Sequence, residues 1–306
     1  MKGSTVNPRS NFHTLAVTAL LAIGGFATQA ADNEPTNSLA IQTLDKADTS
    51  AGGKPLPWEK ASISLGGFIA AFNDNLGFGV NGIGATVNPE KLLGLDSTLY
   101  VFRAGALYRP GKTLRNQLDF TYAAYDRSGS GALSQELNLG GTTYPVGTEF
   151  HSHFNFDLIR GTYSRAILQD ERMRIALGFT LYAVPIDFGL DVQTSGGLKS
   201  VGGANITLPL PALALRSEFL LVPKLFLNAS IDAMYFEMSN FKGSLLDVNV
   251  GLEYRPWKHF GFGLDFNALS LYAEAQGSSS GYPGADFIGS VDARYSGMML
   301  YVKIPF

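Results

Sequence analysis

The sequence predicts an all-β fold: a transmembrane antiparallel up-and-down β-barrel of about ten strands behind an N-terminal signal peptide. Three observations predict it. Apolar and polar residues alternate in ten segments after residue 60, the connections between these segments alternate in length, and an apolar face continues to the last residue, Phe306. A period of two indicates strands, because successive Cβ atoms point to opposite faces of a sheet.

Residues 1–30 have the order of a secretory signal peptide. Lys2 and Arg9 precede a charge-free stretch of 14 residues, TLAVTALLAIGGFA, and the small residues Thr28 and Ala30 follow it. A basic region, a short apolar region and a small-residue cleavage site are the three parts of such a peptide. The stretch is shorter than the roughly 20 apolar residues of a membrane-spanning helix. We therefore expect export and cleavage after Ala30.

Charge and composition exclude several classes of function. Cleavage removes Lys2 and Arg9 and no acid, so the formal charge changes from −3 (23 basic, 26 acidic) to −5 (21 basic, 26 acidic). This balance argues against nucleic acid as a partner. The chain has no cysteine, which excludes disulfides and thiolate chemistry. No later stretch has 18 consecutive apolar residues, so no transmembrane helix is expected.

Residues 31–60 are polar and contain three prolines. This composition predicts a flexible periplasmic N-terminal segment. The alternative is a short plug or a partner-binding segment. The barrel is expected to occupy residues 61–306.

The alternating segments are as long as, or longer than, the roughly 9–11 residues that a tilted strand needs to cross a bilayer. In LLDVNVGLEY, residues 245–254, the even-numbered positions from Leu246 to Tyr254 are apolar, and the odd-numbered positions from Asp247 to Glu253 are polar or glycine. In an outer-membrane barrel the apolar face meets lipid and the polar face lines the lumen. The ten segments are 61–72, 97–109, 115–126, 152–165, 172–184, 210–222, 224–238, 244–255, 259–274 and 289–306.

The connections favour a membrane barrel over a soluble sandwich. Short links of at most six residues alternate with long ones rich in Gly, Ser and Asn, and only 239–243 is short among the second group. Short periplasmic turns and long outer loops are the arrangement of outer-membrane barrels, which have an even strand number in bacterial single chains. An extra hairpin within 76–87 would change the strand number by two. The short links are 110–114, 166–171, 223 and 256–258; the long ones are 73–96, 127–151, 185–209 and 275–288.

The last strand carries an expected assembly signal. Leu300, Val302, Ile304 and the terminal Phe306 form one apolar face. This pattern in MMLYVKIPF resembles the signal that the barrel-assembly machinery recognises on outer-membrane proteins.

A wider resemblance covers most of the mature chain. YAAYDRSGSGAL, TTYPVGTEF, LPLPALALRSEFLLVPKLFL and FKGSLLDVNVGLEYRPWKHFGFGLDFN together resemble a family of uncharacterised proteobacterial outer-membrane β-barrels, of the porin-like small-barrel kind. The resemblance implies the fold and no activity.

The polar faces predict a charge network in the lumen. Acids outnumber bases in it by seven to four, so an open lumen would favour cations. Buried charges of opposite sign must pair, since an unpaired one costs several kcal/mol. Strict alternation with Phe156 and Leu158 would point Arg160 toward lipid, unless Arg160 lies near the periplasmic interface or follows a bulge. The expected members are Arg103, Asp119, Asp157, Arg174, Arg216, Glu218, Asp232, Asp247, Glu253, Asp265 and Lys303.

An enzymatic alternative depends on two histidines. His151 and His153 lie on one face of the fourth strand, near its extracellular end. A His beside a carboxylate can act as a general base, and two His at i, i+2 can hold a metal. No third ligand is evident, Ser152 points the other way, and the motifs of omptin proteases and of the lipid A deacylase family do not match. Neither a catalytic nor a metal site is therefore assigned.

The sequence therefore predicts an integral protein of the bacterial outer membrane, structural or with a narrow, weakly cation-preferring, porin-like lumen. A lipid A- or peptide-modifying enzyme with a rim site at His151 and His153 is the alternative, and a surface adhesin or receptor is the third. We expect no cofactor. The expected partners are outer-membrane lipids, lipopolysaccharide and, during biogenesis, the barrel-assembly machinery.

Overall fold

A computed structural model describes residues 56–72, 75–80, 83–87, 95–134, 136–139, 142–194, 197–238, 241–275 and 289–306. The expected signal peptide 1–30 and most of the expected flexible segment lie outside these residues. In the described part, no helix is long and apolar enough to cross a membrane.

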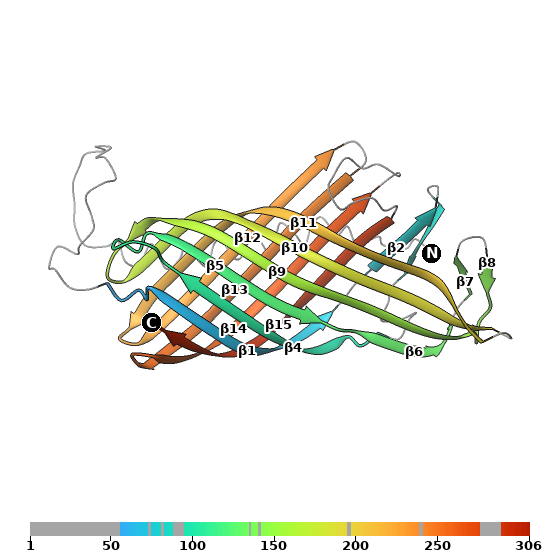
Figure 1. The fold of residues 1–306 in the computed structure, drawn as a ribbon, viewed down its shortest axis with the longest axis horizontal. Helices are drawn as coiled ribbons and strands as arrows, with labels where there is room; N and C mark the ends of the chain where they lie inside the picture. The colour runs from blue at the N-terminus through green and yellow to red at the C-terminus, as the bar shows by residue number, and fades with distance from the viewer. Residues whose placement is uncertain are drawn as a thin grey trace, which may run out of the picture. The chain divides into compact units, whose positions relative to one another are not determined.

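Ten antiparallel strands form a closed ring, which confirms the predicted fold class (Figure 1). Neighbours pair in chain order, and the last strand pairs with the first from Ser62–Pro305 to Phe72–Tyr295. The ring consists of β1 (Ala61–Phe72), β4 (Thr98–Tyr108), β5 (Asn116–Tyr125), β9 (Glu149–Gln169), β10 (Met173–Thr194), β11 (Gly197–Val222), β12 (Leu225–Met238), β13 (Phe241–Trp257), β14 (Phe260–Ala275) and β15 (Gly289–Pro305).

Five short strands lie outside the ring. The predicted hairpin within 76–87 exists, but it extends the loop end of β15 and does not enter the ring, so the ring keeps ten strands. The extra strands are β2 (Asn75–Val80), β3 (Ile83–Val87), β6 (Ser128–Ala132), β7 (Leu137–Leu139) and β8 (Thr142–Tyr144).

The two ends of the ring differ. β1 begins and β15 finishes at the same end, where the Phe306 N–H donates to the Ala61 carbonyl over 2.8 Å. The short connections 109–115, 170–172, 223–224 and 258–259 lie at this end, which we call the terminal end. The opposite end, which we call the loop end, carries the connections 73–97, 126–148 and 276–288. The long link predicted at 185–209 is wrong, because β10 and β11 continue as paired strands and leave only 195–196 between them.

β11 and β12 separate toward the loop end. β11 pairs with β10 as far as Gly197, but with β12 only from Val222 to Leu213. Pro211 and Pro209 lie just beyond Leu213, where the pairing of β11 with β12 has ended. Proline lacks the N–H that a strand ladder needs, so within sheets it is confined to edges. The sheet of β6, β9, β10 and β11 therefore continues beyond the ring (Figure 1).

The outside of the ring is apolar. Ile63, Leu65 and Ile69 on β1 are about half exposed. Outward apolar side chains also alternate along other ring strands, as Leu177, Phe179 and Leu181 do on β10. The assembly-signal residues belong to this surface: Leu300 is 68% exposed, Val302 40%, Ile304 39% and Phe306 63%. A monomer in water rarely exposes such a continuous apolar patch, whereas a membrane barrel presents one to lipid.

The inner face of the barrel becomes apolar toward the loop end, and this corrects two expectations for β9. Phe154, Phe156 and Leu158 point inward and belong to a large apolar core toward the loop end. Asp157 therefore faces outward, contrary to its predicted place in the lumen network. Arg160 faces inward, with no bulge needed and no contact with lipid. Alternation is obeyed, but here the apolar face is the inner one.

Two adjacent glycines on β1 test this assignment of faces. A Cβ on Gly66 would lie 2.6 Å from the Leu300 carbonyl oxygen and 2.7 Å from Tyr301 Cβ, whereas a Cβ on Gly67 would meet nothing within 4 Å. Gly66→Ala should destabilise the barrel by about 1–3 kcal/mol through overpacking. Gly67→Ala should leave stability unchanged or raise it. The temperature at which the barrel unfolds in detergent, followed by gel mobility, distinguishes them; equal effects would contradict the assignment.

Candidate functional site

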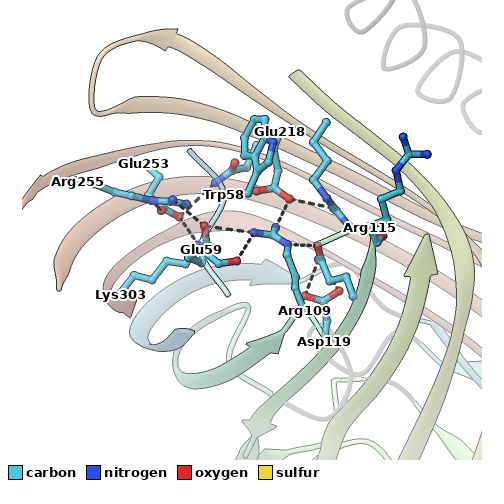
Figure 2. A network of polar contacts seen from close by, with 12 residues as sticks. Trp58, Glu59, Arg109, Arg115, Asp119, Glu218, Glu253, Arg255 and Lys303 are labelled. Atoms are coloured by element: carbon cyan, nitrogen blue, oxygen red, sulfur yellow. Dashed lines mark hydrogen bonds and ion pairs between the residues drawn. The ribbon is translucent and has the colours of Figure 1, made fainter. Parts of the chain in front are cut away.

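A buried carboxylate lies inside the terminal end of the ring. Glu59 Oε1 lies 2.7 Å from Lys303 Nζ, and Glu59 Oε2 lies 2.7 Å from Arg255 Nη1 and 3.3 Å from Arg109 Nη1 (Figure 2). The Glu59 side chain is 3% exposed. Its three cations come from β15, β13 and the residue after β4. A residue that precedes the first strand thus connects distant parts of the ring.

Trp58 fixes the same short segment. Its ring is buried against Phe226 on β12, with 6.1 Å between the centroids, and its Nε1 donates to the Asp170 carbonyl. The backbone is held as well, since Arg109 donates to the carbonyls of Lys60 and Glu59. We call Trp58, Glu59 and the three cations Arg109, Arg255 and Lys303 the terminal seal. The end of the predicted flexible segment is therefore built into the barrel, as its plug alternative anticipates.

Further acids complete the pairing of the seal. Arg109 bonds to Glu218, which also lies 3.2 Å from Arg174 Nη1. Glu253 bonds to Arg255 and lies 3.0 Å from Lys303 Nζ. Each arginine or lysine around Glu59 therefore has a second carboxylate, which is what burial of so many charges demands.

A second charged layer lies deeper in the barrel. Arg216 binds Asp232 through both Nη atoms, at 2.7 and 2.9 Å. The Tyr182 hydroxyl contacts Asp232 Oδ2 at 2.6 Å and Asp247 Oδ2 at 2.9 Å. Arg160 Nη1 lies 3.6 and 3.7 Å from the same two carboxylates. We call Arg160, Tyr182, Arg216, Asp232 and Asp247 the middle network.

The two charges of LRSEF have different partners. Arg216 belongs to the middle network, and Glu218 belongs to the neighbourhood of the seal. Both face inward, but neither compensates the other. Their spacing of two residues along β11 is long enough to place them in successive layers.

Aromatic side chains form a third layer toward the loop end. Tyr125 stacks on Phe156, with centroids 4.5 Å apart and planes 8° from parallel. The ring centroid of Tyr295 lies 5.2 Å from that of Tyr125. Phe72 packs edge-on against Tyr125, with 5.9 Å between the centroids. This aromatic layer is buried, and the Arg127 guanidinium lies over its Phe72 ring, 4.4 Å from the centroid.

Between the seal and the middle network lies a polar cavity of about 170 Å³. Lys303 and Glu253 line it from the seal, and Arg160 lines it from the middle network. Arg103, Asp119 and Asp265 add three charges that belong to neither set. We call this the central cavity.

Ten of the eleven predicted network residues face the interior, and Asp157 does not. The sequence reasoning left Glu59, Arg109 and Arg255 out of the network and left the direction of Arg160 open. Arg109 and Arg255 continue the inward alternation of Leu107 and Glu253, so their signal was present. With these residues, the seal with its neighbouring charges, the middle network and the central cavity together contain seven acids and seven bases, which removes the predicted acid excess. The acids are Glu59, Asp119, Glu218, Asp232, Asp247, Glu253 and Asp265; the bases are Arg103, Arg109, Arg160, Arg174, Arg216, Arg255 and Lys303.

Electrostatics hold Glu59 ionised. Burial by itself would raise the pKa of this carboxyl group, but Lys303, Arg109 and Arg255 together lower the pKa well below its usual range. The pKa of Arg109 is correspondingly raised by Glu218 and Glu59, against the opposing effect of burial. Both groups are therefore charged at neutral pH.

The rim histidines lie away from the lumen. His151 and His153 face outward on the part of β9 that extends past the ring. His153 Nε2 lies 3.4 Å from Asp187 Oδ2 on β10. A surface groove of about 480 Å³ is lined by both histidines together with Ser128, Ser130 and Asp191. Among the described residues, no group of three or more His, Cys, Asp or Glu side chains is placed to hold a metal ion.

Comparison with known proteins gives similarity of fold. No family model matches the chain, and no curated protein matches it. Among solved structures it is similar to the outer membrane protease OmpT from Escherichia coli (7% identity, TM-score 0.48, 80% of this chain and 96% of that one). It is also similar to the translocator domain of NalP from Neisseria meningitidis (12%, 0.43, 82% and 90%) and to Ail from Yersinia pestis (12%, 0.31, 81% and 100%). The closed ring of ten antiparallel strands with its apolar outside is what defines the fold as that of an outer-membrane β-barrel.

The seal predicts a specific pH dependence. A carboxyl group whose pKa is lowered on folding stabilises the fold above its unfolded pKa of about 4.3, and this contribution is lost as the pH falls through the folded pKa. At pH 7, Glu59→Gln should destabilise the barrel by about 3–5 kcal/mol, because three buried cations lose a partner. The difference from wild type should shrink on acidification, since protonated Glu59 resembles glutamine.

Unfolding temperatures in detergent at several pH values measure this difference. Glu171→Gln, in a turn at the same end, is the matched control and should have little effect at any pH. A Glu59→Gln difference that stays constant down to pH 2 would contradict the assignment of the low pKa to Glu59.

Proposed function

We propose that the protein is a structural barrel of the outer membrane whose lumen is closed at rest by its own Trp58–Glu59 segment. The observation that carries the proposal is the burial of Glu59 among cations from three parts of the ring. The terminal end would face the periplasm and the loop end the exterior. Membrane lipids and lipopolysaccharide would cover the apolar outside, and the barrel-assembly machinery would bind the strand that ends at Phe306.

A narrow porin-like conductance is the finer part of the proposal. The seal consists of a short segment that is joined to the ring by side-chain contacts, so its release would open the terminal end. Any ion preference should be small, because inward acids and bases are equal in number in the layers described. Loss of Glu59 would leave the mouth basic, since Arg109, Arg174, Arg255 and Lys303 would then face only Glu218 and Glu253.

Single-channel recording from the mature barrel in a planar bilayer tests this proposal. The wild-type protein should be silent or nearly so. Trp58→Ala combined with Glu59→Ala should give small openings with a weak preference for anions in a salt gradient. Glu171→Ala is the control and should remain silent.

Two outcomes would contradict the closed-barrel proposal. Steady conductance of the wild-type protein would show that the layers do not close the lumen. A folded double variant that remains silent would show that Trp58 and Glu59 do not control closure. Gel mobility before heating establishes that each variant is folded.

The groove at the rim supports a second candidate, a lipid A- or peptide-modifying enzyme. The observation in its favour is the His153–Asp187 contact at 3.4 Å within a polar groove outside the ring. His151→Ala with His153→Ala should then change the lipid A species or the surface proteolysis of cells that express the protein, while barrel stability stays the same. The matched control is His259→Ala at the other end of the barrel. Unchanged lipid A and unchanged proteolysis would remove this candidate.

A further inference from the structure

We propose that the central cavity binds one alkali-metal cation above Gly251, between Asp265 and Asn228. This site goes beyond the closed-barrel proposal, because it requires only the inner wall of the barrel and not a conducting lumen. The inference depends on strand register, on buried polar atoms without partners, and on the lack of a bonded cation beside Asp265.

Register brings the ligands into one row. Gly251 on β13 lies opposite Asn228 on β12 and opposite Asp265 on β14. Directly opposed residues share a face of the sheet, and all three positions face inward. A Cβ on Gly251 would lie 1.7 Å from Asp265 Oδ1, so the carboxylate occupies the space that glycine leaves. The Asp265 side chain therefore leans toward Asn228.

Polar atoms in this row have no partner among the described residues. Asp265 is only 7% exposed, and its Oδ1 has no hydrogen-bond donor there. Asn228 Nδ2 donates to Glu253 Oε2 at 3.3 Å, which leaves Asn228 Oδ1 also without a donor. Buried oxygens in folded proteins nearly always have a partner, commonly water or an ion. Both side chains line the central cavity.

Asp265 is a carboxylate of the cavity that has no bonded cation among the described residues. Lys303 is paired with Glu59 and Glu253, and Arg160 is paired with Asp232 and Asp247. Asp119 accepts two hydrogen bonds from the amide of Gln117. The inward acids and bases are equal in number over the layers as a whole, but burial of a carboxylate without a directly bonded partner is costly, so a small cation beside Asp265 would be favoured.

Ligand chemistry points to a monovalent cation. One carboxylate and one amide oxygen, with the Ser230 hydroxyl in the next row, offer oxygen ligands but little negative charge. Calcium takes about 6–8 oxygen ligands, usually with several carboxylates. A cavity of about 170 Å³ has room for a small ion with several waters, each of which fills about 30 Å³ in the liquid. An anion would be repelled by Asp265.

Thermal unfolding in detergent at constant ionic strength tests the site. Sodium or potassium chloride is compared with choline chloride, whose cation is too large for the row above Gly251. Ligand that binds only the folded state stabilises it, so the small cations should raise the unfolding temperature of the wild-type barrel by about 2–4 °C. Asp265→Asn should abolish the difference between the salts. Asp191→Asn, in the outer groove, is the matched control and should retain it.

Two results would overturn the site. The first is an unfolding temperature of the wild-type protein that does not depend on the cation. The second is retention of the full difference by Asp265→Asn. Proton binding by Asp265 in place of a metal ion would give the first result together with a dependence on pH, and would also reject the proposal.

Thallium, an anomalously scattering substitute for potassium, provides a measurement that does not depend on stability. Crystals of the barrel grown with thallium acetate should show a single anomalous peak between Asp265 Oδ1 and Asn228 Oδ1. Gly251→Ala should lose this peak, because the added methyl group fills the position of the carboxylate. A map of the wild-type protein without a peak above Gly251 would overturn the proposal even if the barrel conducts or remains closed as proposed.

Discussion

The structure depends on one constraint: a charge inside the barrel must meet its opposite there, because neither lipid nor bulk water can reach it. Glu59 makes the constraint visible. Glu59 precedes β1, but its carboxylate is buried inside the barrel. This burial is stable because Lys303, Arg255 and Arg109 surround the carboxylate. Each of these groups contacts at least two of opposite charge, so removing one member weakens several contacts and the layer is held together as a network rather than as separate pairs.

The same constraint explains the order of layers along the barrel. Charged side chains occupy the terminal half, where ten strands bring acids and bases from different parts of the chain within reach of one another. Toward the loop end the inner face becomes apolar, and stacked aromatic rings replace ion pairs. An interior filled in this way leaves a small polar cavity as the described space between the charged layers. The contacts that stabilise the barrel are therefore also the ones that fill its interior.

The sequence predicted the ring well and the interior unevenly. On β13 and β14 one face carries acids and amides and the other is apolar, so alternation alone placed Asp247, Glu253 and Asp265 inside. On β9 the inner face is itself apolar, and the rule that apolar residues face lipid misplaced Asp157 and Arg160. Alternation separates two faces but does not identify the inner one. Tertiary packing decides that, and a single strand does not contain the information.

The seal was harder to predict for a different reason. Arg109 and Arg255 continue the period of their strands, whereas Glu59 lies in a polar, proline-containing segment with no periodicity. Its role depends on partners that are remote in the sequence, on β13, on β15 and after β4. Composition correctly marks such a segment as unable to form a core of its own. It cannot show that the segment completes a core formed by others.

One consequence concerns the order of synthesis. Glu59 is translated before any strand of the ring, and its closest cation on β15, Lys303, is translated almost last. The carboxylate therefore has no complete set of partners until the final strand has closed against β1. Glu59 can take its place only in a finished ring. A chain interrupted before its last strand would keep this segment in water, where a protease could distinguish it from a completed molecule.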